Sequence, residues 1–422
     1  MENVRKEFLK ELNTEIYFNT MDKFKTSTFE ITYRFHKDEV DIATLNLLAL
    51  LLADSCKDYP NTPLLSSRLE ELYGSAISPK VSVSGDIVSF NIQAAFISDF
   101  YAEKGLSDKV IELAAKLIYE PNFVKSKFEK SYFEFEKSKL VASSLKTQER
   151  KESCAELRFN ELLEKECGTK NPMLITKKLE KVTLNNVMNM YEKLLNTNYV
   201  ILVVGDLDEE EIKQSFIKYF KKTVAQKEIS LIHPVNKEIK NKTEKNEKFS
   251  QSVLFTVYDI DTNILSNDLD HYSAFLYSVL LNDRAFEVVR EKHGLCYAIH
   301  ASYANKHGYL RVSAGIEASK YRKTLSLINK EIEKIKLGKI QNKVWNKVKE
   351  YICGVLRSND DDVISYLRSL ESYLLKGKYK TTDDVINQIR NITKEDVIRI
   401  ANKTKHLTTY MLKGVAGGDN NE

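Results

Sequence analysis

The sequence contains few of the residues that interrupt or cross-link a chain. Its 422 residues include 14 glycines, 6 prolines and 5 cysteines. The cysteines are odd in number and none belongs to a C-x-x-C pair, which argues against a disulfide framework and against a zinc knuckle. We therefore interpret all five as reduced thiols of a cytoplasmic protein: Cys56, Cys154, Cys167, Cys296 and Cys353.

Long hydrophobic runs and an excess of one charge are also missing. The longest apolar run, at 45–53, is less than half of the ~20 residues that a membrane-spanning helix needs. The first eighteen residues lack the apolar core of a signal peptide. With 64 basic and 60 acidic residues, the net charge is only +4. Neither a membrane span nor a nucleic-acid partner is therefore expected.

The signatures of common catalytic sites do not occur either. None of the seven histidines belongs to an H-E-x-x-H or H-x-x-E-H pattern, in which two imidazoles one helical turn apart hold zinc. There is no G-x-S-x-G elbow, no P-loop and no G-x-G-x-x-G turn. We interpret His300 and His307, which bracket an expected turn, as surface imidazoles. Glu149, Glu152 and Glu156 are interpreted as a solvated stripe of one helix.

What the chain does contain is an internal repeat with an offset of 220 residues. RLEELYGSA at 68–76 aligns with VVREKHGLC at 288–296, and FNIQAAF at 90–96 aligns with LRVSAGI at 310–316. The second pair shares the alternating apolar pattern of a half-buried strand. Each copy is therefore expected to be a helix, a glycine at its left-handed end, and two strands.

Further along, two Thr-capped amphipathic helices are predicted at 182–191 and 392–401. We predict an α+β protein of two homologous halves, 1–225 and 251–422, joined by a charged linker at 226–250. In each half, an antiparallel-rich sheet is expected to have helices packed on one face.

The segment VVREKHGLCYAIHASY at 288–303 has the pattern of a helix end, a turn and a strand. Reversal of the chain at Gly294 would bring Tyr297 back beside Arg290. A guanidinium and a phenol placed together could hold a peptide carbonyl or a developing oxyanion. The alternative is that Arg290 pairs with neighbours such as Glu291, while Tyr297 packs within the sheet.

With these residues in view, the chain resembles the insulinase-like (pitrilysin) zinc metallopeptidase family over nearly its whole length. The resemblance is strongest at 280–316, where family members carry a similar R-E-x-x-G-L-x-Y run. The family is built from duplicated α+β halves, as is this chain. In active members, an Arg and a Tyr seven positions apart reach toward the substrate, and Arg290 and Tyr297 match that pair.

The family's zinc motif has no counterpart in this chain. The H-x-x-E-H positions fall near Asn46, Ala49 and Leu50, and the Ala and Leu side chains can neither ligate zinc nor activate a water. The family's third ligand, a downstream glutamate, would correspond to Glu136 or Glu149. The helix is instead apolar all round, as a buried helix is.

The resemblance therefore implies a non-catalytic subunit of a heterodimeric zinc metallopeptidase. Zinc is expected in an insulinase-like partner, and no cofactor is expected in this chain. This chain would supply Arg290 and Tyr297 to the partner, which would cleave short or unfolded peptides. Processing of bacteriocin-like or modified peptides in bacteria is a further expectation, as is a homodimer when the partner is missing. Two alternatives remain, a structural or binding protein on the same fold and a cysteine peptidase that uses Cys296.

Overall fold

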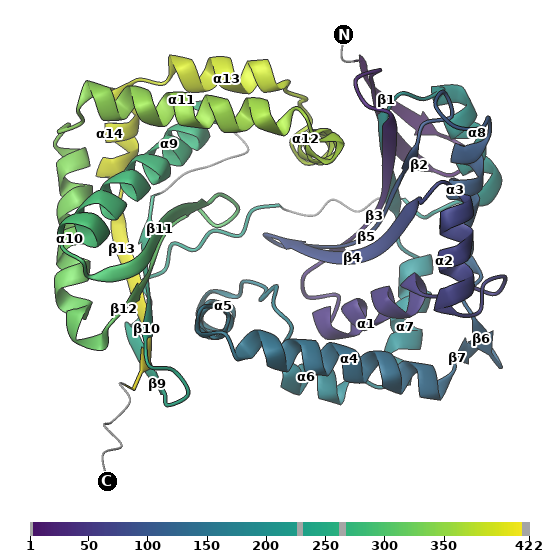
Figure 1. Ribbon diagram of the computed structural model, residues 1–422, viewed down its shortest axis with the longest axis horizontal. Helices are drawn as coiled ribbons and strands as arrows, with labels where there is room; N and C mark the ends of the chain where they lie inside the picture. The colour runs from purple at the N-terminus through teal and green to yellow at the C-terminus, as the bar shows by residue number, and fades with distance from the viewer. Residues whose placement is uncertain (1–2, 226–230, 261–266, 416–422) are drawn as a thin grey trace. The chain divides into compact units, whose positions relative to one another are not determined.

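The structure is a computed structural model that describes residues 3–225, 231–260 and 267–415, and the chain folds into two compact units (Figure 1). We call them the N unit and the C unit. The N unit consists of three segments: 1–145, 172–231 and 359–380. The C unit consists of the remaining three: 146–171, 232–358 and 381–422.

The N unit is built on a six-stranded sheet with the order β1-β2-β8-β3-β5-β4. Its strands are β1 (Asn3–Leu9), β2 (Thr14–Thr20), β3 (Thr26–His36), β4 (Ala76–Ser84), β5 (Ile87–Ile97) and β8 (Tyr199–Gly205). All neighbours are antiparallel except β2 and β8. Every residue of β8 is buried, because both faces of the sheet are covered at this central strand.

Eight helices and a small hairpin complete the N unit within the described residues. They are α1 (Ile42–Ala53), α2 (Thr62–Glu71), α3 (Leu106–Tyr119), β6 (Phe123–Val124), β7 (Lys127–Phe128), α4 (Lys130–Gln148), α6 (Thr176–Lys181), α7 (Leu184–Leu195), α8 (Glu209–Tyr219) and α12 (Val363–Lys376). Helix α1 contacts β4, β5 and α7, so it is enclosed between the sheet and another helix. This explains its apolar residues on all sides.

The C unit is built on a five-stranded sheet with the order β11-β12-β10-β13-β9, in which only β13 and β9 are parallel. Its strands are β9 (Lys242–Asn246), β10 (Ser252–Asp259), β11 (Cys296–Ala304), β12 (Tyr309–Ile316) and β13 (Lys405–Gly414). Its helices are α5 (Lys151–Cys167), α9 (Asp268–Ala285), the π-helix η1 (Phe286–Lys292), the 3-10 helix η2 (Ala318–Lys320), α10 (Tyr321–Lys336), α11 (Asn342–Asn359), α13 (Thr382–Asn391) and α14 (Lys394–Asn402).

The two sheets repeat one plan. The order β4-β5-β3-β8-β2 in the N unit corresponds strand for strand to β11-β12-β10-β13-β9 in the C unit, including the single parallel pair. Helices α7 and α14 begin with matching capping boxes, from Thr183 to Asn186 and from Thr393 to Asp396. The predicted α+β class, with two similar halves and antiparallel-rich sheets, is confirmed.

Each sheet also receives one helix from the other half of the chain on its second face. Helix α12 packs Tyr366, Leu367 and Leu370 into the cluster that includes Tyr17 and Leu202 of the N unit. Helix α5 packs in the same way on the C-unit sheet, where the Phe159 ring lies 5.2 Å from Phe255 and 6.1 Å from Tyr410, centroid to centroid. Helix α12 therefore belongs to the N unit and helix α5 to the C unit, although the segments on either side of each helix belong to the other unit.

The segment 226–250, expected to be a linker, is partly sheet. Residues 242–246 form the edge strand β9, whose charged side chains suit an edge that is exposed to water. Residues 226–230 lie outside the described residues. The boundaries of the two halves at 225 and 251 stay a prediction.

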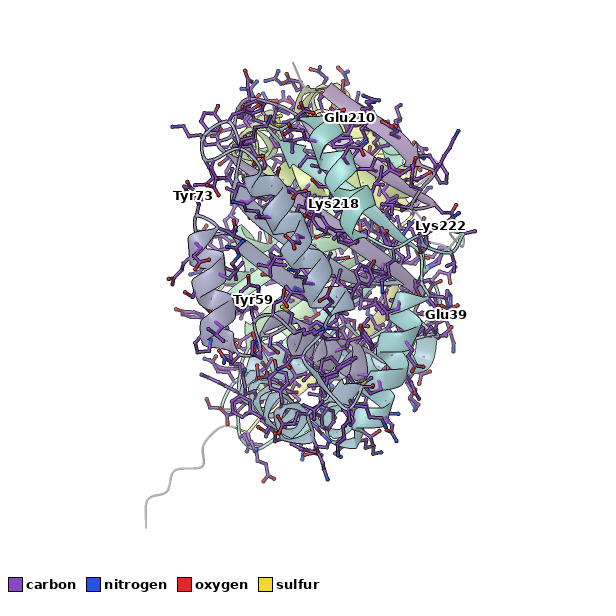
Figure 2. The ribbon with its side chains drawn as sticks, turned by 90° about the vertical axis from the view of Figure 1, so that its right-hand side faces the viewer. Glu39, Tyr59, Tyr73, Glu210, Lys218 and Lys222 are labelled. Atoms are coloured by element: carbon purple, nitrogen blue, oxygen red, sulfur yellow. The ribbon has the colours of Figure 1, made fainter. Side chains whose placement is uncertain are left out.

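Exposed charged side chains of the N unit include Glu39, Glu210, Lys218 and Lys222 (Figure 2). Within the described residues, no helix is both long enough and apolar enough to cross a membrane.

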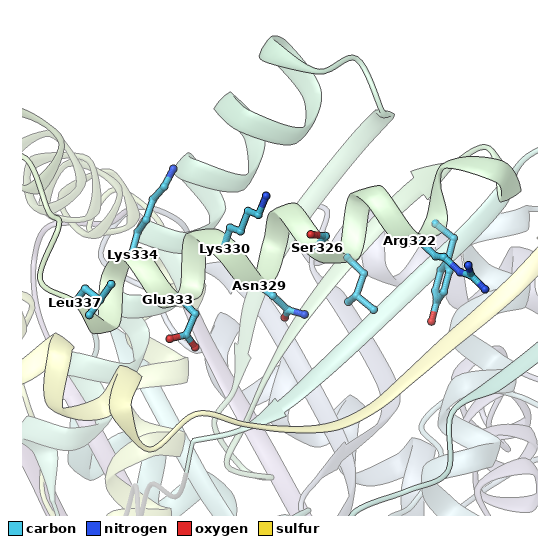
Figure 3. A pocket seen from close by; sticks show the side chains of 9 residues that line it. Arg322, Ser326, Asn329, Lys330, Glu333, Lys334 and Leu337 are labelled. Carbon is cyan, nitrogen blue, oxygen red and sulfur yellow. The ribbon is translucent and has the colours of Figure 1, made fainter.

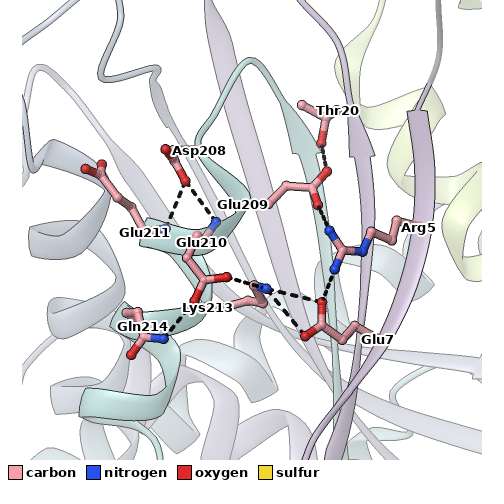
Figure 4. A network of polar contacts seen from close by, with 9 residues as sticks. All are labelled: Arg5, Glu7, Thr20, Asp208, Glu209, Glu210, Glu211, Lys213 and Gln214. Atoms are coloured by element: carbon pink, nitrogen blue, oxygen red, sulfur yellow. Dashed lines mark hydrogen bonds and ion pairs between the residues drawn. The ribbon is translucent and has the colours of Figure 1, made fainter.

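A network of ion pairs connects side chains of edge strand β1 with side chains of helix α8 (Figure 4). Lys213 Nζ lies 2.6 Å from Glu210 and 3.2 Å from Glu7, and Arg5 lies 2.8 Å from Glu7 and 3.4 Å from Glu209. Isolated surface ion pairs contribute little, but Lys213 is buried and shares two carboxylates. The network therefore holds the edge strand against the helix.

Replacement of Gly205 with alanine is expected to destabilise the N unit by roughly 2 kcal/mol. Gly205 has φ +139°, and a Cβ atom there would lie 2.7 Å from the Ser27 Cα atom of neighbouring strand β3. The matched control is Gly354→Ala on α11, where a Cβ meets no atom within 4 Å. Urea unfolding of both variants checks this, and equal stabilities would contradict it.

Candidate functional site

Helix α1 contains the three positions at which the sequence predicts a replaced zinc motif. Asp41 caps it by accepting a hydrogen bond from the Thr44 backbone N–H. Asn46 and Leu50 lie one turn apart on its half-buried face, and Ala49 is buried. The Asn46 side-chain amide donates to the Ile42 carbonyl at 2.9 Å. No side chain at these three positions is arranged to hold a metal or to activate a water.

Of the two glutamates considered for the third ligand, Glu136 lies beside the end of α1. Its carboxylate, which is fully buried, accepts from Lys139 Nζ at 2.9 Å, and Lys139 lies 3.9 Å from Asp54, the residue that ends α1. Glu149 lies in the turn before α5, in the C unit. In this chain, Lys139 is the cation that Glu136 faces. The described residues contain no group of three or more His, Cys, Asp or Glu side chains that could hold a metal.

Arg290 lies in a distorted helix end. Helix α9 changes into the π-helix η1, whose wider turns often occur at functional sites. Gly294 then adopts φ +56°, its N–H donates to the Arg290 carbonyl, and the Leu295 N–H donates to the Val289 carbonyl, both at 3.0 Å. The bond from Gly294 to Arg290 is that of an αL motif, and the left-handed glycine ends the helix and reverses the chain.

Tyr297 is the extra residue of a β-bulge. Cys296 pairs with Ile316 and Ala298 pairs with Gly315, so two steps along β11 correspond to one step along β12. A regular strand would place Tyr297 on the same face as Ile299, which is buried under the helices. The bulge turns the side chain outward instead, and Tyr297 is 80% exposed.

The helix end and the bulge bring the two predicted residues together. Arg290 Cζ lies 5.9 Å from the centroid of the Tyr297 ring and 4.7 Å from that of Phe286. The guanidinium thus lies near two aromatic rings, and both Arg290 and Tyr297 are exposed. The alternative in which Tyr297 packs within the sheet is not what the structure shows. A ligand at this corner of the C unit could reach a cation and a phenolic hydroxyl.

A groove of about 190 Å³ adjoins Tyr297 on the open face of the C-unit sheet, between α5 and the strands β10, β12 and β11. Apolar and small side chains form much of its lining, including Val253, Phe255 and Ala298. Glu156 of α5 lies 2.6 Å from Arg311 of β12 in this groove. The prediction that Glu156 belongs to a solvated stripe is therefore wrong, because packing of α5 on the sheet gives it a cationic partner.

The outer edge of β11 is partly occupied. The Ala301 backbone N–H donates to the side-chain oxygen of Asn282 on α9, at 2.9 Å. An extended peptide therefore cannot use this donor, and the bulge at Tyr297 interrupts regular pairing as well. Contacts by side chains at Arg290, Tyr297 and the groove are better supported than addition of a strand at this edge.

Cys296 does not have the surroundings of a nucleophile. It is half-buried at the start of β11, and burial raises the pKa of its thiol, with only a smaller opposing effect from Arg290. A reactive cysteine needs the opposite shift. His300 is exposed and lines the groove, whereas His307 lies in the β11–β12 turn with its Nδ1 atom 2.8 Å from the His233 carbonyl.

A larger hollow of about 620 Å³ follows the exposed side of α10 and is lined by side chains such as Arg322, Asn329 and Glu333 (Figure 3). These side chains come from a single helix and the residue after it, and they spread along the helix rather than converge on one point. This hollow is therefore a weaker candidate for a specific site than the groove beside Tyr297.

Comparisons with known proteins agree with the resemblance to zinc peptidases that the sequence suggests. The family description "Peptidase M16 inactive domain" matches residues 181–352. The probable inactive metalloprotease YmfF of Bacillus subtilis is 25% identical over 94% of this chain and 95% of its own length. The uncharacterized zinc protease YmxG of the same organism is 30% identical, over 29% of this chain and 30% of its own.

A solved structure extends the agreement to the whole fold. The crystal structure of a conserved protein from Enterococcus faecalis matches 99% of this chain and 100% of its own, with a TM-score of 0.91 at 22% sequence identity. These findings confirm the resemblance drawn from the sequence: the chain is similar to insulinase-like peptidases, among them a relative named as an inactive metalloprotease.

Proposed function

We propose that this chain is the non-catalytic subunit of a heterodimeric insulinase-like zinc peptidase. It supplies Arg290 and Tyr297 to the active site of a zinc-bearing partner, which cleaves short or unfolded peptides. One observation carries the proposal: a π-helical turn and a β-bulge expose these two side chains at one corner, in a chain with no metal ligand at Asn46, Ala49 or Leu50.

The chemistry of the pair fits this role. The guanidinium donates hydrogen bonds and carries a fixed positive charge, and the phenol adds a neutral donor. Groups of this kind stabilise the negative oxygen that develops when a zinc-bound water attacks a peptide carbonyl. The comparisons support a division of labour, since B. subtilis has one relative named as an inactive metalloprotease and another named as a zinc protease.

We further propose a cytoplasmic location, a role in processing of bacteriocin-like or modified peptides, and a homodimer when the partner is missing. The second candidate is a structural or binding protein on the same fold. The missing zinc ligands are as compatible with a structural protein as with a peptidase subunit. However, the exposed Arg290 and Tyr297 have no evident use in a structural protein.

Purification of the tagged chain from its native host tests the proposal. We expect a second insulinase-like chain with an intact H-x-x-E-H motif to co-purify, with about one zinc ion per pair. The metal content and the mass of the complex are measured on the same sample. A chain that elutes alone, or as a metal-free homodimer, would instead support the scaffold.

A further inference from the structure

The floor of the groove beside Tyr297 is made of two rows of residues that cross the C-unit sheet. The strand register places Val253, Gly315 and Ala298 in one row, with Phe255, Ser313 and His300 in the next. The first row has small residues, Gly315 and Ala298, at its middle position and at edge strand β11. A Cβ atom at Gly315 would meet no atom within 4 Å, so the space above this residue is open.

The wall of the groove on the α5 side carries charges that are already paired. Glu156 lies 2.6 Å from Arg311, and the Arg311 guanidinium lies 5.1 Å from the centroid of the Phe255 ring. Lys151 contacts the Gln251 side chain and lies 3.6 Å from Glu152. A charged ligand would have to compete with these pairs, whereas an uncharged apolar group can lie over Gly315 and the exposed Ala298 without breaking any of them.

The size of the groove restricts the ligand further. Pockets for drug-sized ligands measure roughly 300–1,000 Å³, and this groove, at about 190 Å³, is smaller. It suits one side chain rather than a cofactor. Tyr297 lies at its rim, so a peptide held at Arg290 and Tyr297 would place a neighbouring side chain over Gly315 and Ala298.

We infer that this groove is a specificity subsite for one large uncharged side chain, aromatic or aliphatic, of the peptide held at Arg290 and Tyr297. The inference rests on the proposed function, because it takes a peptide as the ligand of that corner. It adds a substrate class: peptides with a bulky apolar residue close to the bond that the partner cleaves.

The test uses the full-length chain and short fluorescent peptides of alternating Ser and Thr with one central guest residue. Burial of a large apolar side chain stabilises binding by roughly 1.5–3 kcal/mol. We therefore expect Trp and Leu guests to bind at least ~10-fold more tightly than an Ala guest in fluorescence anisotropy. Lys and Glu guests should bind no better than Ala.

Gly315→Val fills the groove and should remove the preference for Trp and Leu while leaving the affinity for the Ala guest unchanged. Gly315→Ala, which fills less of the space, should give an intermediate result, and Gly354→Ala on α11 should change nothing. The circular dichroism of each variant confirms that it folds. Ala298→Val, in the same row, provides a second blocking variant.

Equal affinity for all guests, no measurable binding, or an equal loss for Trp and Ala guests in Gly315→Val would each overturn the subsite. A different result would reject the proposed function but not the subsite. In that case Arg290→Ala and Tyr297→Phe leave the affinity for every guest peptide unchanged, while the preference for Trp and Leu persists.

Discussion

Replacement of Arg290 with alanine in the assembled two-chain enzyme is expected to slow peptide cleavage roughly 10²–10³-fold. Loss of one preorganised donor to a developing oxyanion typically has an effect of this size. The loss should appear mainly in kcat, because the interaction is strongest in the transition state. Tyr297→Phe should produce a loss in the same direction, and it keeps the ring near the guanidinium while removing only the hydroxyl.

The controls separate catalysis from assembly. Arg322→Ala removes another exposed arginine of the C unit, on α10, and should leave the cleavage rate unchanged. Size-exclusion chromatography and zinc content should be the same for all variants, because Arg290 and Tyr297 are exposed and support no core. Full activity of both Arg290→Ala and Tyr297→Phe in an assembled complex would rule out the proposed division of the active site.

Local patterns made much of the fold predictable. The alternation in FNIQAAF and LRVSAGI reports burial on one side of a strand, and these segments lie in β5 and β12. A threonine followed three residues later by Asn or Asp predicts the start of a helix, as at Thr183 and Thr393. The apolar character of 42–53 on all sides predicts a buried helix, and α1 is one.

The geometry of the candidate site was less predictable because it depends on contacts between distant segments. Gly294 indicated the turn, but the bulge at Tyr297 exists only in relation to its partner Gly315 on β12. Likewise, nothing near Glu156 in the sequence shows that α5 packs on the C-unit sheet against Arg311. Neighbouring residues determine a helix or a turn. A bulge depends in addition on pairing with the next strand, and the position of α5 depends on a contact between residues 155 positions apart, Glu156 and Arg311.

Two carboxyl groups, that of buried Glu30 and that of half-buried Glu371, lie where α12 packs on the N-unit sheet. Glu30 of β3 is fully buried, accepts from the Thr32 hydroxyl at 3.1 Å and lies 2.8 Å from Lys80 Nζ. Burial, followed by the nearby Glu30 carboxylate, raises the pKa of Glu371 on α12 to about 7, against smaller opposing effects of Lys80 and Arg368. Below about pH 7 the Glu371 carboxyl therefore holds its proton in the folded protein, because burial and the nearby Glu30 carboxylate disfavour its charged form.

This proton makes the stability of the N unit depend on pH in a defined direction. The ordinary pKa of a glutamate is near 4.5, so between about pH 4.5 and 7 the folded state holds a proton that the unfolded chain releases. Stability from this group is complete below pH 4.5 and is lost as the pH rises through 7. Since a tenfold change in proton affinity is worth ~1.4 kcal/mol, the full loss is about 3 kcal/mol.

Glu371→Gln should therefore remove this pH dependence. The amide is neutral at every pH and can still donate to Glu30, so the variant should exceed the wild-type protein by up to about 3 kcal/mol at pH 8 and differ little from it at pH 4.5. Urea unfolding at several pH values measures the difference. Glu134→Gln, at an exposed position of α4, should follow the wild-type curve at every pH. Parallel curves for the wild-type protein and Glu371→Gln would show instead that Glu371 is ionised in the fold and that α12 is held by its apolar contacts alone.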